Sequence, residues 1–280
     1  MRVIEASKLG EAVESLCLEI STTLPRDVLD ALADFRGRER SEQGRSVLDM
    51  IIENALVAST EGVPLCQDTG VFTVYIAPGE DTAISGDIQA EASAAVARAT
   101  ERGRLRASVV SSPLDERRNT GDNTPAFVEL EAPRGKATTI GVLAKGGGSE
   151  MASRSAMLLP GSGWEGVREF VLGVVALVGA RSCPPLVLGL GVGGTFDRAA
   201  ALAKRALMEP LDSPKGDRRT ATREEDLVAA VNRLGIGPGA LGGTTTCIGA
   251  RIIEAPCHLA SLPVALSVNC HSLRRKVMEI

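Results

Sequence analysis

The chain has 280 residues, 44% of them hydrophobic, which is enough to bury the core of one large domain or of two ordinary ones. Its formal net charge is -4, acidic and basic residues are interspersed, and only 2% of the residues are aromatic. The sequence therefore lacks the basic stripe and the stacking platforms of nucleic-acid binders, and the polybasic patch that binds anionic membranes. We expect no nucleic-acid partner and no membrane partner.

The N-terminal residues and the number of cysteines indicate the cellular compartment that we expect for the protein. Residues 1–5 lack the apolar core of a signal peptide, and the apolar run at 170–180 is too short to span a bilayer. We therefore expect a cytoplasmic protein. Six cysteines among 280 residues are too few for a disulfide scaffold, so thiols in a reducing compartment are expected to pack, bind metal or react. With only two histidines, a His-rich metal site is excluded.

The first third of the chain has the apolar spacing of helices. Four residues recur on one helix face: Leu9, Val13, Leu16 and Ile20. Pro25 suits the start of a second helix, and the apolar residues between 47 and 56 predict a third. Three helices are therefore expected before the loop that contains Cys66.

The rest of the chain mixes strands and helices. Strands are predicted near 71–77, 126–131, 137–144, 186–190, 248–254 and 262–269, and helices near 87–100, 164–178, 195–208 and 223–234. Because helices cluster early and several strands are adjacent, we expect an α+β fold with mixed or antiparallel sheets, surrounding helices and a helical N-terminal third. The polar stretch 210–222 is interpreted as a surface loop, so residues 1–280 are predicted to form a single domain.

Two glycine-rich segments are candidates for anion contact. Residues 189–194, Gly-Leu-Gly-Val-Gly-Gly, follow a predicted strand and precede a helix, which formally matches the dinucleotide fingerprint. No second strand with an acidic ribose ligand follows, so close packing or contact with a smaller anion is favoured instead. The three glycines after Lys145 form either a nest for a carboxylate, to which Lys145 adds charge, or a flexible turn.

The cysteines differ in their surroundings. Cys17 lies on the apolar side of the first predicted helix and is expected in the core, and Cys247 has no polar neighbour that suggests a ligand. Cys66, Cys183 and Cys270 occupy loop or strand-end positions. Three thiolates without a fourth suit an iron-sulfur cluster with one open iron, although separations this long are unspecific by themselves.

Two Cys-His pairs raise a zinc alternative, which geometry disfavours. They are Cys257-His258 and Cys270-His271. Neighbouring residues of an extended segment point to opposite faces, so both members of a pair would not easily reach one tetrahedral ion.

Six short motifs follow one another along the chain. They are CQDTG at 66–70, GDNTPA at 121–126, KGGGSE at 145–150, CPP at 183–185, GLGVGGT at 189–195, and HLASLP at 258–263 leading to Cys270. Their content and order resemble the iron-sulfur class I fumarase and L-tartrate dehydratase family. The likeness covers nearly the whole chain and matches the family's N-terminal region, which occurs as a separate α subunit in two-component enzymes.

The resemblance implies a metal centre and two catalytic residues. Cys66, Cys183 and Cys270 would hold a four-iron four-sulfur cluster with one iron not bound by cysteine, a Lewis acid for adding or removing water. Asp68 resembles the carboxylate that orients and activates a hydroxyl base in the family's C-terminal region. His258 resembles a residue that contacts the substrate in the catalytic site.

The resemblance also implies substrate-binding roles for Gln67, Arg106, Lys145 and Gly147. Taken alone, three of the residues to which the resemblance gives roles have simpler interpretations. Arg106 would be a solvated arginine in a basic patch, Asp68 an Asx-turn carboxylate and His258 a half-buried histidine with its hydrogen bonds satisfied.

The expected function is the α subunit of an iron-sulfur hydro-lyase acting on a C4 dicarboxylate. Fumarate and malate are the first candidates, L-tartrate is next, and mesaconate stays open. A separate β subunit is expected to supply the base and complete the site, in an α2β2 assembly or with a homodimer of α. Two alternatives remain, namely a cluster-free nucleotide-binding oxidoreductase using residues 189–194 and a non-catalytic binding protein with cysteines in its core.

Overall fold

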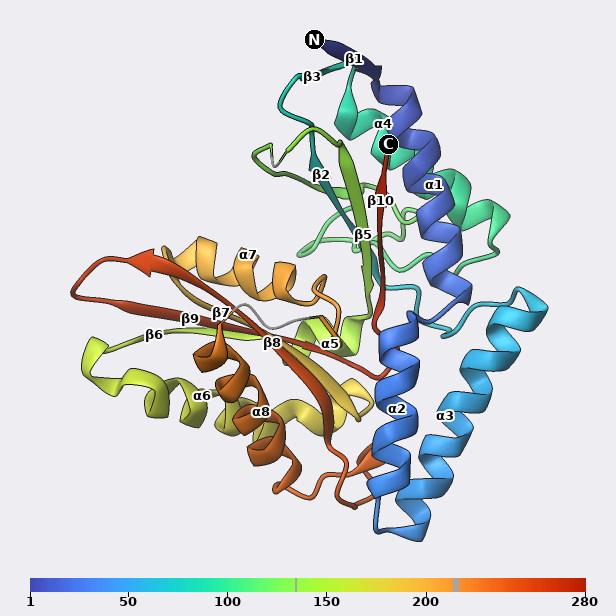
Figure 1. Ribbon diagram of the computed structural model, residues 1–280. Helices are drawn as coiled ribbons and strands as arrows, with labels where there is room; N and C mark the ends of the chain where they lie inside the picture. The colour runs from blue at the N-terminus through green and yellow to red at the C-terminus, as the bar shows by residue number, and fades with distance from the viewer. Residues whose placement is uncertain (134, 214–216) are drawn as a thin grey trace. The chain divides into compact units, whose positions relative to one another are not determined.

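The computed structural model describes residues 1–133, 135–213 and 217–280. They divide into two compact units, each assembled from separate stretches of the chain. Unit 1 comprises Met1–Pro25, Ala55–Gly147 and Arg274–Ile280, and unit 2 comprises Arg26–Asn54 and Gly148–Leu273. In unit 1, blue, green and red segments of the ribbon therefore lie together (Figure 1). The expectation of a single domain over residues 1–280 stays a prediction.

Unit 1 is built on a four-stranded sheet of order β10-β5-β2-β4. The strands are β2 (Val71–Ala77), β4 (Phe127–Leu130), β5 (Thr139–Lys145) and β10 (Arg274–Glu279). Strand β5 runs antiparallel to both β2 and β10, whereas β2 and β4 are parallel. A second, two-stranded parallel sheet pairs β1 (Arg2–Glu5) with β3 (Thr82–Ser85).

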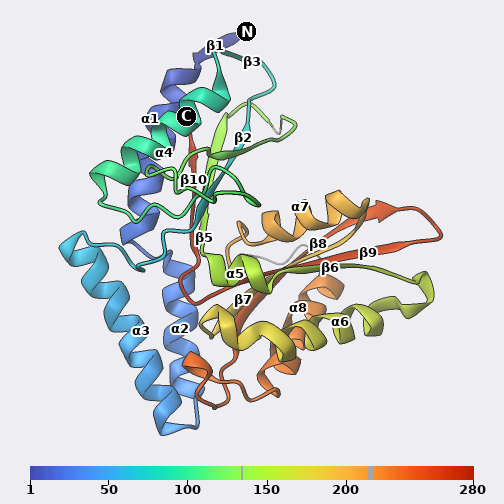
Figure 2. The ribbon, with the colours of Figure 1, turned by 180° about the vertical axis from the view of Figure 1, so that it is seen from behind.

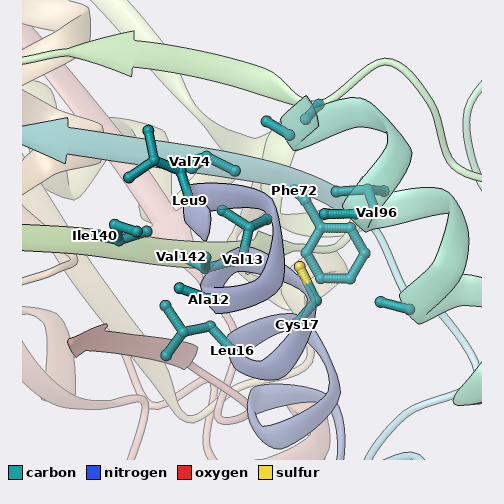
Figure 3. Packing of buried hydrophobic residues seen from close by; sticks show 14 of the residues in the cluster. Leu9, Ala12, Val13, Leu16, Cys17, Phe72, Val74, Val96, Ile140 and Val142 are labelled. Carbon is teal, nitrogen blue, oxygen red and sulfur yellow. The ribbon is translucent and has the colours of Figure 1, made fainter. Parts of the chain in front are cut away.

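Two helices cover the larger sheet of unit 1, α1 (Ala6–Thr22) and α4 (Ile88–Arg102). The apolar face predicted for the first helix packs into this core. Figure 3 shows Val13 and Cys17 of α1 beside Phe72 of β2 and Val96 of α4, all of them buried. Burial raises the pKa of the Cys17 thiol, which confirms Cys17 as a core residue.

Unit 2 is built on a sheet of order β6-β9-β7-β8. The strands are β6 (Arg154–Leu158), β7 (Leu186–Gly194), β8 (Cys247–Cys257) and β9 (Leu262–Asn269). Strand β7 is parallel to β8 and antiparallel to β9, which is antiparallel to β6. Helix α7 (Phe196–Ala206) covers one face of the sheet, and α6 (Gly163–Val178) and α8 (Arg218–Asn232) cover the other (Figures 1 and 2).

The remaining helices are shorter or connect the two units along the chain. Helix α2 (Arg26–Arg38) belongs to unit 2, and α3 (Glu42–Glu61) and the short α5 (Gly147–Ala152) each continue from one unit into the other. Single 3-10 turns occur at Pro160–Ser162, Gly179–Ser182 and Pro238–Ala240. Every helix within the described residues is too short or too polar to span a bilayer, and the cytoplasmic location stays a prediction.

The glycine segment 189–194 forms the C-terminal two thirds of β7 rather than a loop. A Cβ on Gly189 would lie 2.2 Å from the Ala203 carbonyl oxygen, and one on Gly191 would lie 2.1 Å from that of Ala199. These two glycines therefore allow α7 to pack closely on the strand. Close packing, one of the two interpretations given to the segment, is confirmed.

The α+β class, the mixed sheets and the three early helices are confirmed. The short strands β1, β3, β6 and β10 and the helix α5 were not predicted. Helix α8 begins at Arg218, inside the expected loop 210–222, because the Asp217 side chain caps it by accepting a hydrogen bond from the Thr220 amide. Residues 214–216 of that expected loop lie outside the described residues.

Candidate functional site

The carboxylate of Asp68 is the centre of a polar cluster in unit 1. Its Oδ1 accepts hydrogen bonds from the Gly70 amide at 3.0 Å, Arg106 Nη2 at 3.2 Å and Ser108 Oγ at 3.3 Å. Its Oδ2 accepts from the Gly147 amide at 2.8 Å. Four donors from three segments of the chain therefore converge on one side chain.

These contacts keep the Asp68 carboxylate ionised. Burial raises its pKa, but the Gly147 and Gly70 amides and the charges of Arg106 and Arg274 together hold the pKa below the ordinary 3.8. The Asp68 side chain is 29% exposed and that of Arg106 is 59% exposed. The cluster therefore presents an ionised carboxylate and an accessible guanidinium side by side, which suits contact with a substrate carrying both a hydroxyl and a carboxylate.

Glycines allow the segments around Asp68 to pack closely against one another. Gly70 has φ +72°, and a Cβ there would lie 2.1 Å from the Lys145 carbonyl oxygen. A Cβ on Gly146 would lie 2.9 Å from Asp68 Oδ2. Of the glycines after Lys145, Gly147 donates its amide to a carboxylate, that of Asp68 itself.

Three predicted substrate contacts of unit 1 differ in accessibility. Gln67 and Gly147 are exposed, whereas Lys145, at the end of β5, is only 1% exposed. The roles of all three stay predictions.

Sequence reasoning did not single out Ser108 or Asn123 as site residues. Asn123 is fully buried, and its side chain bonds the backbone on both sides of Ala107, just before the Ser108 hydroxyl reaches Asp68. Asn123 does lie in the GDNTPA motif, and its φ of 63° is of the kind that Asn tolerates. The motif was a usable signal, but the side-chain contacts were not readable from it.

Unit 2 brings the segments of two predicted cysteine ligands together. Cys183 follows a 3-10 turn with φ 49°, and its carbonyl oxygen lies 3.5 Å from the His271 amide and 3.0 Å from His271 Nδ1. The adjacent Cys270 donates its amide to Ser149 Oγ at 3.2 Å. Backbone contacts therefore hold both cysteine segments in neighbouring positions.

The third predicted ligand, Cys66, belongs to unit 1. It is partly buried, and its Sγ lies 3.4 Å from the Asp68 amide, which donates to it. Within the described residues of each unit, no three His, Cys, Asp or Glu side chains gather into a group that would hold a metal ion.

The chemistry of the thiols separates structural cysteines from candidate ligands. All six cysteines lie in the described ranges, and none of them forms a disulfide. Cys247 is buried, and burial raises its pKa to about 12, so it stays protonated as expected of a core residue. Cys66, Cys183 and Cys270 are partly or fully exposed and so remain able to act as thiolate ligands. This donor set fits an iron-sulfur cluster in its chemistry.

His258 lies in the turn between β8 and β9 of unit 2 and is exposed rather than half-buried. Its Nδ1 accepts a hydrogen bond from the Ala260 amide at 3.1 Å. When the ring is neutral this bond places the proton on Nε2, which makes Nε2 a donor toward solvent or a ligand. Its catalytic role stays a prediction.

Comparison with known proteins gives a consistent result over the full chain. A family model described as fumarate hydratase (Fumerase) matches residues 10–279. The chain is 39% identical over 279 residues to the putative L(+)-tartrate dehydratase subunit alpha of Methanocaldococcus jannaschii, covering 98% of each chain. It is 32% identical over 276 residues to the L(+)-tartrate dehydratase subunit alpha of Escherichia coli (strain K12), covering 98% of this chain and 91% of the relative.

Proposed function

Because the chain belongs to the fumarate hydratase family and is a hydro-lyase of that type, we propose that it is the α subunit of an iron-sulfur enzyme acting on a C4 dicarboxylate. The sequence alone ranks fumarate and malate first. The names of the relatives, both L(+)-tartrate dehydratase subunits, raise L-tartrate to the first place. Mesaconate is the third acid to test.

The Asp68 cluster is the observation that carries this proposal. Removing or adding water on a dicarboxylate requires a cation for a carboxylate and an ionised group that handles or orients a base. Arg106 supplies an accessible guanidinium, and the four donors on Asp68 keep its carboxylate ionised. Asp68 would then orient a hydroxyl base that the partner subunit supplies, with Gln67, Gly147, Lys145 and His258 as further contacts to the substrate.

We assign Cys66, Cys183 and Cys270 as ligands of a four-iron four-sulfur cluster. When bound, the iron without a cysteine ligand supplies the Lewis acid for the substrate's hydroxyl. The assignment is supported by the family, by the partial or full exposure of the three cysteines and by the contacts that hold the Cys183 and Cys270 segments together.

The cysteine assignment predicts loss of iron from each single variant. Cys66→Ser, Cys183→Ser and Cys270→Ser should each lose most of the iron and the broad visible absorption of the anaerobically purified protein, because a thiolate ligand is removed. Cys257→Ser is the matched control, since Cys257 is also exposed and donates through Sγ to the Ser261 carbonyl oxygen. Iron retained in all three ligand variants would contradict the assignment and favour the non-catalytic alternative.

The β subunit is the second part of the proposal. The relatives are named as alpha subunits, so we expect a β subunit to complete the site, in an α2β2 assembly or around a homodimer of α. The test is anaerobic co-expression with a β-type partner and parallel assays on fumarate, malate, L-tartrate and mesaconate. We expect activity from the complex and none from the chain alone. A complex that contains iron but is inactive on every acid would overturn the proposal.

The nucleotide-binding alternative loses its structural basis. Its glycines lie within β7 under α7, not in a turn that would face a pyrophosphate. We therefore expect nicotinamide nucleotides to leave the thermal stability of the protein unchanged.

A further inference from the structure

Three consecutive residues, 106–108, are held by two asparagine side chains. Asn123 Nδ2 donates to the Arg106 carbonyl oxygen at 3.0 Å, and Asn123 Oδ1 accepts from the Ser108 amide. Asn119 Nδ2 donates to the intervening Ala107 carbonyl oxygen at 3.0 Å. The backbone that carries Arg106 and Ser108 is therefore held by side-chain hydrogen bonds at each of these three residues.

Asn123 is the buried member of this pair. Its side chain is 0% exposed, and its Nδ2 also lies 3.3 Å from Thr100 Oγ1 on α4. The amide thus uses its donor and its acceptor at once, which a shorter or an apolar side chain at this position would not reproduce. Removing it would leave the Ser108 amide and the Arg106 carbonyl without these partners.

The contacts that hold residues 106–108 also determine which side chains reach Asp68. Arg106 Nη2 and Ser108 Oγ both meet the same oxygen of Asp68, Oδ1. The Arg106 side chain is long and largely exposed, so its own packing does little to restrict it. The position of its guanidinium therefore depends on the position of the Arg106 backbone.

Building on the proposed function, we propose that Asn123 is a positioning residue that aligns Arg106 and Ser108 with the Asp68 carboxylate and so sets the affinity for the substrate's carboxylate. Arg106 binds the substrate's carboxylate, and Asn123 affects that binding through the position of Arg106. Misplacing a positioned group by about 1 Å can cost up to roughly 100-fold in rate or affinity.

The test uses the iron-loaded αβ complex and two variants. Asn123→Gly keeps a residue that adopts a φ of 63° and removes the amide, so it separates hydrogen bonding from backbone conformation. Asn123→Asp keeps the acceptor for the Ser108 amide and removes the donor to the Arg106 carbonyl. We expect KM to rise roughly 10-fold in the glycine variant and less in the aspartate variant, with kcat changed less than about threefold and iron content unchanged.

Gln89→Ala is the matched control. Gln89 donates its side-chain amide to the Ala126 carbonyl oxygen at 2.9 Å, the same kind of bond to the same loop, without touching 106–108. We expect its KM to match the wild type. A glycine variant with wild-type KM, or a control with an equal increase in KM, would overturn the proposal.

A double-mutant cycle separates positioning from general loosening. Arg106→Lys shortens the reach of the cation and loses its fork geometry. If Asn123 acts through Arg106, adding Asn123→Gly to Arg106→Lys should raise KM by less than twofold further. Additive effects would show that Asn123 does not act through Arg106.

Hydrogen exchange keeps the inference testable if the proposed activity is absent. In the full-length protein, Asn123→Gly should accelerate exchange of the Ser108 amide at least about tenfold, whereas Gln89→Ala should not. A wild-type complex without hydro-lyase activity but with this acceleration would reject the proposed function and keep the positioning contact. Unchanged exchange at Ser108 would reject the positioning contact itself.

Discussion

Two carboxylates, one in each unit, are held ionised by several hydrogen bonds but differ in their surroundings. Asp68 of unit 1 is 29% exposed at its side chain and shares Oδ1 with the accessible Arg106. Glu39 of unit 2, between α2 and α3, is 2% exposed. Its donors at 2.7–3.0 Å are the amides of Arg40, Ser41, Thr244 and Thr245 and the hydroxyl of Thr244.

The comparison shows that a lowered pKa does not by itself mark a functional carboxylate. Burial raises the pKa of Glu39, but the hydrogen bonds from Thr244, Ser41 and Thr245 outweigh it and lower the pKa to about 2. Its oxygens are turned inward and join the segment between α2 and α3 to residues 244–245. The Asp68 side chain is instead partly exposed to solvent, and so is the Arg106 guanidinium beside it. Accessibility and a neighbouring guanidinium, rather than the pKa, distinguish the candidate site from the structural contact.

The largest effect that this distinction predicts is on catalysis by Asp68→Asn. The variant removes the carboxylate that would orient the base, so we expect kcat of the αβ complex to fall about 100-fold or more. Because the pKa of Asp68 is below 3.8, the carboxylate stays ionised through the physiological range. Any loss of activity above about pH 5 should therefore come from another group.

Steady-state kinetics and a pH profile measure this effect. Asp87→Asn is a suitable control, because Asp87 caps α4 by accepting from the Ala90 amide and Asn caps helices equally well. An Asp68→Asn complex that kept more than a tenth of the wild-type kcat would place Asp68 in the same structural class as Glu39.

The second prediction concerns Glu39 of unit 2, where we expect a loss of stability and no loss of activity. Glu39→Gln should lower the unfolding free energy at pH 7 by about 3 kcal/mol, since a fall in pKa from 4.5 to about 2 corresponds to that stabilisation. The stabilisation of a group with a lowered pKa is fully present above the unfolded value and is lost as pH falls through the folded value. The gap between wild type and variant should therefore narrow from pH 4.5 down to about 2.

Urea denaturation across this pH range, with kinetics at pH 7, measures the effect. We expect kcat and KM of the Glu39→Gln complex to match the wild type at a temperature where both proteins are folded. A stability difference that does not depend on pH would mean that the charge of Glu39 does not provide the stabilisation.

The two carboxylates also show what the sequence can predict. Asp68 was found through the CQDTG motif, and its simpler interpretation as an Asx-turn holds as well, because Oδ1 accepts from the Gly70 amide two residues on. Glu39 gave no signal, since its partners Thr244 and Thr245 lie 205 and 206 residues away. Local motifs predict local geometry, whereas contacts of this range depend on the complete fold.

The same limit applies to the secondary structure. Local signals, namely apolar periodicity and a proline at a helix start, predicted α1 to α3. Strand β10, with the sequence Arg-Arg-Lys-Val-Met-Glu, instead becomes a strand by pairing with β5 about 130 residues earlier. Close packing of residues 189–194 was expected from their glycines, but nothing local reveals that these residues extend β7 or that α7 is the helix that packs on them.

The smallest predicted effects come from removing one hydroxyl donor from each carboxylate. Ser108→Ala deletes the 3.3 Å bond to Asp68 Oδ1, and Thr244→Ala deletes the 3.0 Å bond to Glu39 Oε1 while keeping the Thr244 amide contact. We expect Ser108→Ala to lower kcat/KM about threefold to tenfold and to change the unfolding free energy by less than about 0.5 kcal/mol. Thr244→Ala should instead cost about 1.5 kcal/mol of stability and leave kcat/KM unchanged.

This pair of variants tests the comparison most closely, because the two changes are chemically alike. Each removes one hydroxyl bond to an ionised oxygen that keeps at least two other donors. If the accessible carboxylate acts on substrate and the buried one on the fold, the two variants must affect different quantities. Equal losses of stability, with kcat/KM unchanged in both, would show that the Asp68 cluster is a second structural contact and that exposure beside Arg106 does not identify the site.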